Sequence, residues 1–130
     1  MKYLSLIIFL IVTPVMAETI VSPNEFESLS TDKTLYFSKD GKAYGAEHFY
    51  KGRRSKWRYS NGICEDGEWF TQGELFCFNY ESNIETQCWT FFKTDEGYAA
   101  RAEGAPLDEF LKLYHIDRKP LLCKGDGLSV

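Results

Sequence analysis

Four cysteines, all downstream of an export-type leader, constrain the fold of this chain more than any other feature. They are Cys64, Cys77, Cys88 and Cys123. Disulfides form and persist in exported proteins, so we expect these cysteines to be structural cross-links. A zinc site would favour close pairs such as C-x-x-C, whereas successive cysteines here are separated by 12, 10 and 34 residues. We therefore expect two disulfides, no metal and no cofactor.

The leader occupies residues 1–17. Lys2 supplies a positive charge, residues 4–12 are almost entirely apolar, and Val15-Met16-Ala17 has the small-x-small pattern of a cleavage site. The apolar run is well short of the roughly 20 residues that a membrane-spanning helix needs. We therefore expect a cleaved signal peptide and no membrane insertion. The remaining residues, 18–130, are predicted to be one periplasmic or secreted domain and a monomer.

Charge and aromatic content further restrict the possible partners and fold classes. The formal net charge is −4, and loss of the leader with its single lysine makes it more negative. Nucleic-acid binding depends on basic surfaces that contact phosphates, so we expect no nucleic-acid partner. Aromatic residues make up 16% of the chain, which favours a packed β structure.

From residue 34 onwards, the sequence predicts seven short strands separated by turn signals such as Lys39-Asp40-Gly41 and Asn61-Gly62. Consecutive hairpins of this kind indicate a mainly β fold, a small antiparallel up-and-down barrel of about seven or eight strands. The expected strands cover residues 34–38, 42–50, 56–60, 63–70, 74–80, 86–94 and 97–102.

Two helices are expected outside these strands. Ser22, Pro23 and Glu25 form a helix start with a capping box, which predicts a short helix over 23–29. A second, amphipathic helix is predicted over 105–115, covering an end or flank of the barrel. Its apolar stripe would consist of Leu107, Phe110, Leu111 and Tyr114.

The hairpin over 75–92 relates the cysteines to the strands. A turn centred on Ser82-Asn83 places Cys77 opposite Cys88, at a separation that a disulfide can bridge. Cys64 would then pair with Cys123 and fasten the C-terminal tail. The rival pairing joins Cys64 to Cys77 across the preceding hairpin. In the first register, strand alternation puts one set of aromatic residues on the core face: Phe76, Phe78, Tyr80, Trp89 and Phe91.

Three segments also resemble a known pattern. The segments 64–69, 75–80 and 87–89, followed by Pro120-Leu121-Leu122-Cys123, look like the G-x-W, L-C-F, C-W and P-L-x-C motifs of an uncharacterised family of small exported bacterial proteins. The resemblance covers roughly residues 30–123. It implies export, disulfides and a lipocalin-like small β-barrel. It carries over no catalytic residue.

A basic stretch is the strongest charge feature, and aromatic residues are interleaved with it. It is a candidate partner-binding loop for an anionic partner, such as a lipid head group, a polyanionic glycan or an acidic enzyme cleft. The alternative is a solvated loop, neutralised by Glu65, Asp66 and Glu68 nearby. The basic residues are Lys51, Arg53, Arg54, Lys56 and Arg58.

No residue pattern predicts catalysis. Glu47 and His48 are neighbours in one strand and must point to opposite faces, so they do not form a dyad. His115 stands alone, and the acidic pairs lie in turns or exposed strands. We therefore expect a non-enzymatic barrel that binds a small apolar ligand in the cell envelope.

Two alternatives remain open. One is a protein-binding module, such as an inhibitor of a hydrolase, by analogy with the small exported β-barrels that inhibit lysozyme; a loop around Arg53 and Arg54 would enter the target. The other is a hydrolase with a cryptic site. The ligand-binding hypothesis requires an internal cavity, and it would fail if aromatic side chains filled the barrel completely.

Overall fold

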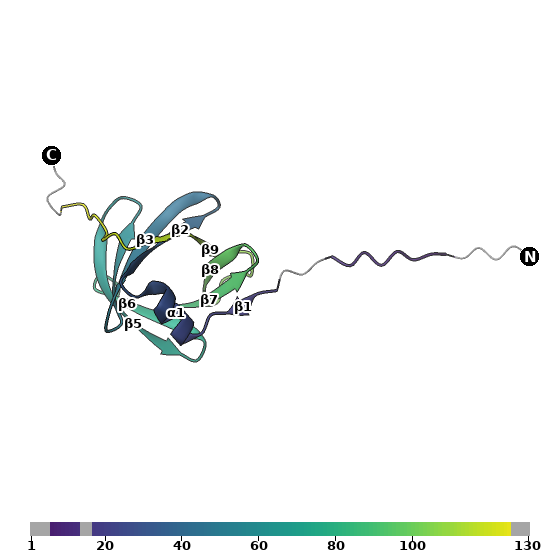
Figure 1. Ribbon diagram of the computed structural model, residues 1–130, viewed down its shortest axis with the longest axis horizontal. Helices are drawn as coiled ribbons and strands as arrows, with labels where there is room; N and C mark the ends of the chain where they lie inside the picture. The colour runs from purple at the N-terminus through teal and green to yellow at the C-terminus, as the bar shows by residue number, and fades with distance from the viewer. Residues whose placement is uncertain (1–5, 14–16, 126–130) are drawn as a thin grey trace, which may run out of the picture.

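The structure is a computed structural model that describes residues 6–13 and 17–125, and Figure 1 shows its barrel and the extended N-terminal segment. It contains one helix and nine strands among these residues. In chain order these are β1 (Thr19–Ile20), α1 (Pro23–Ser30), β2 (Lys33–Lys39), β3 (Lys42–Tyr50), β4 (Arg54–Tyr59), β5 (Cys64–Gln72), β6 (Leu75–Tyr80), β7 (Gln87–Thr94), β8 (Gly97–Ala102) and β9 (Leu111–Asp117).

Strands β2 to β9 form a closed antiparallel barrel. Each strand pairs with the next one along the chain, and β9 also pairs with β2, which completes the ring. The predicted up-and-down barrel is therefore confirmed, and all seven predicted strands are present, with ends shifted by a few residues. Closure leaves the eight barrel strands without the open sheet edges that invite aggregation.

The β6–β7 hairpin has the register that the sequence predicts. Phe76 pairs with Trp89, Cys77 with Cys88, and Phe78 with Gln87. The aromatic side chains of the predicted core face pack together in the interior. The cysteines lie at disulfide distance in two pairs, with S–S separations of 2.03 Å for Cys64–Cys123 and 2.09 Å for Cys77–Cys88. The rival bridge between Cys64 and Cys77 is not formed.

The helix predicted over residues 105–115 is wrong. Residues 103–110 form a loop with turns at 103–104 and 107–108, and the following residues form β9. Leu111 and Leu113 face the core. Tyr36 of β2 pairs with His115 and Phe37 pairs with Leu113, so Tyr114 is skipped in the register and forms a bulge. The apolar spacing suits either a helix or a bulged strand. Pairing with β2 and β8 decides between them, because without β9 both strands would expose unpaired backbone groups.

Strand β1 was not predicted. It pairs with a part of β7 that β6 leaves unpaired. Strand β6 pairs with β7 only as far as Trp89, and β1 pairs with the same edge of β7 at Phe92 and Lys93. Glu18, just before β1, accepts two hydrogen bonds from Arg101, at 3.1 and 2.8 Å. Among the described residues, hydrogen bonding to the barrel therefore begins at Glu18, directly after the predicted cleavage site.

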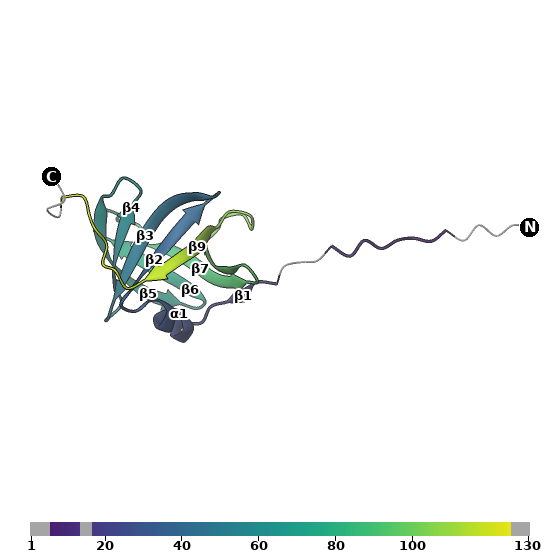
Figure 2. The same cartoon turned by 45° about the horizontal axis from the view of Figure 1, so that its top comes forward.

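Helix α1 closes one end of the barrel (Figure 2). Ser22 caps it by accepting a hydrogen bond from the Glu25 N–H, as predicted. The fully buried Phe26 inserts from the helix into the barrel. Its ring centroid lies 5.3 Å from that of Phe49, 5.1 Å from Trp69, 4.6 Å from Phe76 and 4.7 Å from Phe91. The helix end of the barrel is therefore filled with aromatic side chains.

The segment before the barrel bears on the predicted leader. Among its described residues, Leu6 to Val12 are between 75% and 88% exposed and belong to no helix or strand. Figure 1 shows this segment extending away from the barrel. Lys2, Val15 and Met16, on which the prediction also depends, lie outside the described residues.

Candidate functional site

The end of the barrel opposite α1 contains a cavity. Turns alternate between the two ends of an up-and-down barrel, and the β3–β4 turn lies beside α1, where Arg53 meets Glu27. The β2–β3, β4–β5, β6–β7 and β8–β9 connections therefore surround the other end, where an open cavity of about 170 Å³ enters the barrel. Its lining residues are Phe37, Tyr44, Glu47, Trp57, Tyr59, Phe78, Tyr80, Gln87, Trp89, Phe91, Ala100 and Leu111.

Glu47 is the charged group in this lining. It lies on β3 with its side chain turned inward, and only 5% of the residue is exposed. The Tyr80 hydroxyl donates a hydrogen bond of 2.7 Å to its Oε1 atom. The Ser55 hydroxyl is also turned towards the carboxyl group and lowers its pKa, but it falls short of a full hydrogen bond. No described residue forms an ion pair with Glu47.

Burial determines the protonation of Glu47 and of Tyr80, the residue that donates a hydrogen bond to it. Loss of solvent raises the pKa of Glu47 to about 7, an effect that the hydrogen bond from Tyr80 only partly offsets. Burial and the neighbouring Glu47 together raise the pKa of Tyr80, so its hydroxyl keeps its proton and remains a donor. Near neutral pH, the cavity wall therefore holds a carboxyl group that changes charge readily.

Two glycines make room for the aromatic walls. A Cβ atom on Gly67 would lie 2.7 Å from the ring of Tyr80, and one on Gly45 would lie 2.3 Å from the ring of Trp57. Both distances are shorter than packed atoms allow, so any side chain at these positions would push the rings out of place. The glycines thus leave the space that the rings of Tyr80 and Trp57 occupy against the barrel wall.

The mouth of the cavity is partly polar. Tyr44 and Tyr59 are 43% and 42% exposed there. The ring centroid of Trp57 lies 6.0 Å from that of Tyr44 and 6.1 Å from that of Tyr59. Glu65 accepts hydrogen bonds from Tyr59 and Ser82, which ties β4 and β5 to the β6–β7 turn. The bond to Glu65 raises the pKa of Tyr59 to about 12, so Tyr59 is neutral at physiological pH.

The basic residues of the predicted binding loop do not come together at this mouth. Lys51 and Arg53 lie in the β3–β4 turn at the opposite end, and each forms an ion pair, with Asp32 and Glu27 respectively. Arg53 also lies over the ring of Trp69, 4.8 Å from its centroid.

The other three basic residues lie on β4. Lys56 pairs with Asp66, and the Arg58 Nε donates to the carbonyl oxygen of Leu122 in the tail. Arg54 forms no ion pair within the described part of the chain. The stretch is thus spread along a strand, and most of its charges have partners within the protein.

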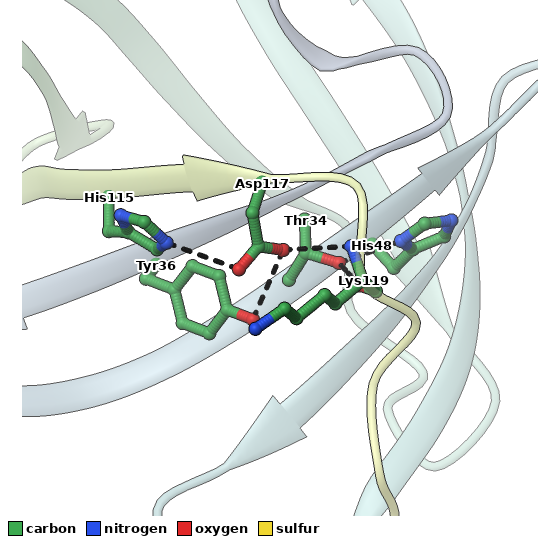
Figure 3. A network of polar contacts seen from close by, with 6 residues as sticks. All are labelled: Thr34, Tyr36, His48, His115, Asp117 and Lys119. Atoms are coloured by element: carbon green, nitrogen blue, oxygen red, sulfur yellow. Dashed lines mark hydrogen bonds and ion pairs between the residues drawn. The ribbon is translucent and has the colours of Figure 1, made fainter.

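A polar cluster on the outside of the barrel contains both histidines (Figure 3). Thr34 is fully buried beneath the tail, and its hydroxyl donates to the carbonyl oxygen of Lys119 at 2.5 Å. His48 Nδ1 lies 2.7 Å from the same hydroxyl, so the neutral ring carries its proton on Nδ1 and donates it. Burial lowers the pKa of His48, which favours this neutral form.

Asp117 organises the other half of the cluster. Although desolvation opposes its charge, hydrogen bonds from Lys119, His115 and Tyr36 lower its pKa. Figure 3 shows these side chains gathered where the chain leaves β9. The cluster fastens the tail to β2 and β3, upstream of the Cys64–Cys123 bridge. Glu47 and His48 point to opposite faces of β3, as predicted, so they cannot act together.

Sequence reasoning placed the aromatic core face but missed Glu47, Gly45 and Gly67 as parts of a site. A usable signal was present, since Glu47 shares strand parity with the core residue Phe49 and pairs with the partly buried Trp57.

Within the described residues, no three metal-binding side chains cluster, and no helix has the length and apolarity needed to cross a membrane. Comparison with protein-family models, curated proteins and solved structures finds no match for this chain.

Proposed function

We propose that this protein is an exported, non-enzymatic β-barrel that holds one small, largely apolar molecule in its cavity. The observation that carries the proposal is the unequal filling of the barrel. Phe26 and its aromatic neighbours fill the end beside α1, whereas the opposite end keeps a cavity of about 170 Å³. An apolar cavity of about 150 Å³ is large enough to bind benzene. The cavity therefore suits a compact molecule of about that size.

The N-terminal region supports export. Residues 6–12 are exposed, whereas Glu18 and β1 are bound to the barrel. A cut after Ala17 would leave every described barrel contact in place. The two cysteine pairs at disulfide distance suit an oxidising compartment outside the cytoplasm.

The observations favour a cavity ligand over the alternatives. Four of the five residues in the candidate loop, Arg54 being the exception, are engaged by acidic side chains or by the tail, which leaves little basic surface for an enzyme cleft. Thr34, whose hydroxyl lies 2.7 Å from His48 Nδ1, is fully buried and bonded to a backbone carbonyl, so it is poorly placed to attack a substrate.

Native mass spectrometry tests the proposal on protein isolated from the producing cells without denaturation. We expect a bound small molecule in the parent protein and its loss in Ala100→Leu, because Ala100 is 2% exposed and lines the cavity. The matched control is Ala43→Leu, which adds the same atoms at an exposed position on β3 and should retain the ligand. Absence of any adduct in the parent, together with no thermal shift from ring-sized compounds, would refute the proposal.

A further inference from the structure

The cavity contains a buried acid with no described positive partner. Transfer of a carboxylate into a protein interior costs several kcal/mol unless a counter-charge compensates it. Among the described residues, the lining includes no lysine, arginine or histidine. This part of the cavity wall thus bears one potential negative charge and no positive one, which disfavours anionic ligands and favours cationic ones.

None of the described groups that face Glu47 carries a positive charge, so the space beside its carboxyl group remains available to a cation. Tyr80 from β6 and Ser55 from β4 contribute hydroxyl groups, and Tyr59 from β4 is neutral. Glu65 from β5 is a second acid on the same side, and its negative charge adds to the field of Glu47. From β2, the core-facing side chains beside this site are the apolar Leu35 and Phe37.

The aromatic walls supply the second half of a cation site. Trp and Tyr rings attract positive charge through their faces, and the attraction strengthens where water is excluded. Gly45 and Gly67 provide the space that Trp57 and Tyr80 occupy beside the carboxyl group. The rings suit an ammonium group surrounded by methyl or methylene groups better than a strongly hydrated metal ion. The complete aromatic wall consists of Phe37, Tyr44, Trp57, Tyr59, Phe78, Tyr80, Trp89 and Phe91.

We propose that the cavity binds a small organic cation, a quaternary ammonium or protonated amine, whose charge lies against Glu47 within the aromatic walls. This inference rests on the proposed function, because it specifies the ligand of the same cavity. The ligand combines a compact, largely apolar skeleton with one positive charge, and its size is limited by the cavity volume of about 170 Å³.

Two probes of the same size and shape, one charged and one neutral, isolate the effect of the positive charge on binding. Choline carries a quaternary nitrogen, and 3,3-dimethylbutan-1-ol has a carbon atom in its place. We expect choline to bind at least about tenfold more tightly than the alcohol at pH 8, measured by tryptophan fluorescence and calorimetry. Glu47→Gln should remove most of this preference while retaining the shape of the side chain, and the aromatic walls account for what remains. The matched control is Glu68→Gln, which removes an exposed carboxylate on the outer face of β5 and should leave the preference intact.

The pH dependence gives an independent readout. Because the pKa of Glu47 is raised to about 7, its ionised fraction falls roughly tenfold between pH 8 and pH 6, and choline affinity should fall by about the same factor. Equal or tighter binding of the alcohol, or choline affinity that rises on acidification, would overturn the inference while leaving the cavity a binding site. If neither probe binds and no ring-sized compound binds, both the inference and the proposed function fail.

Discussion

Replacement of Glu47 by glutamine should stabilise the ligand-free protein at neutral and alkaline pH. Burial raises the pKa of this carboxyl group from 4.5 to about 7, so ionisation is less favourable in the folded chain than in the unfolded one. At about 1.4 kcal/mol per pKa unit, the charged group costs the fold roughly 3 kcal/mol above pH 7. Glutamine keeps the side-chain volume and an acceptor for the Tyr80 hydroxyl, without the charge.

The expected gain depends on pH in a defined direction. The folded protein holds the Glu47 proton more tightly, so the stability of the parent is highest below pH 4.5 with respect to this group and falls as the pH rises to about 7. The advantage of Glu47→Gln should therefore be near zero at pH 4 and reach about 3 kcal/mol at pH 8.

Urea unfolding at pH 4, 6 and 8 measures this difference from the transition midpoints. Glu68→Gln is the control, because an exposed carboxylate on the outer face should change stability by less than about 0.5 kcal/mol. A variant at position 47 that is less stable than the parent at pH 8 would refute the reasoning. Such a result would mean that the folded protein stabilises the charge.

Three further predictions concern the fold that supports the site. Loss of the Cys64–Cys123 bridge, which spans 59 residues, should cost about 1.5 kcal/mol more in urea unfolding than loss of Cys77–Cys88, which spans 11; the reverse order would contradict this. Gly67→Ala should destabilise the barrel by about 1–3 kcal/mol and weaken cavity binding, because its Cβ collides with Tyr80; unchanged calorimetric stability would contradict the packing. N-terminal sequencing of exported protein should begin at Glu18, and a start at Met1 would refute cleavage.

The sequence was sufficient to predict seven of the nine described strands, β2 to β8, because their signals are local. Turn dipeptides such as Asn61-Gly62 and the alternation of the β6–β7 aromatic residues act over a few positions, so the barrel and the hairpin register followed directly. The region around Leu111 was mispredicted because its apolar spacing suits two structures. The choice depends on β2 and β8, which lie far away in the sequence.

The site was harder to predict because it depends on three-dimensional relations between strands. The burial of Glu47 depends on closure of the barrel and on Tyr80, which lies 33 residues away in sequence. The role of Gly67 appears only when the neighbouring strand brings Tyr80 over it. The basic stretch stood out in the sequence, but the structure places acidic partners from α1 and β5 beside it.

The most direct test of the cavity as a binding site is a crystal structure of the protein with choline at saturating concentration. We expect the trimethylammonium group beside the Glu47 carboxylate, within about 6 Å of the ring centroid of Trp57 or Tyr80. A cavity that holds only ordered water, with choline bound elsewhere or absent, would contradict the account.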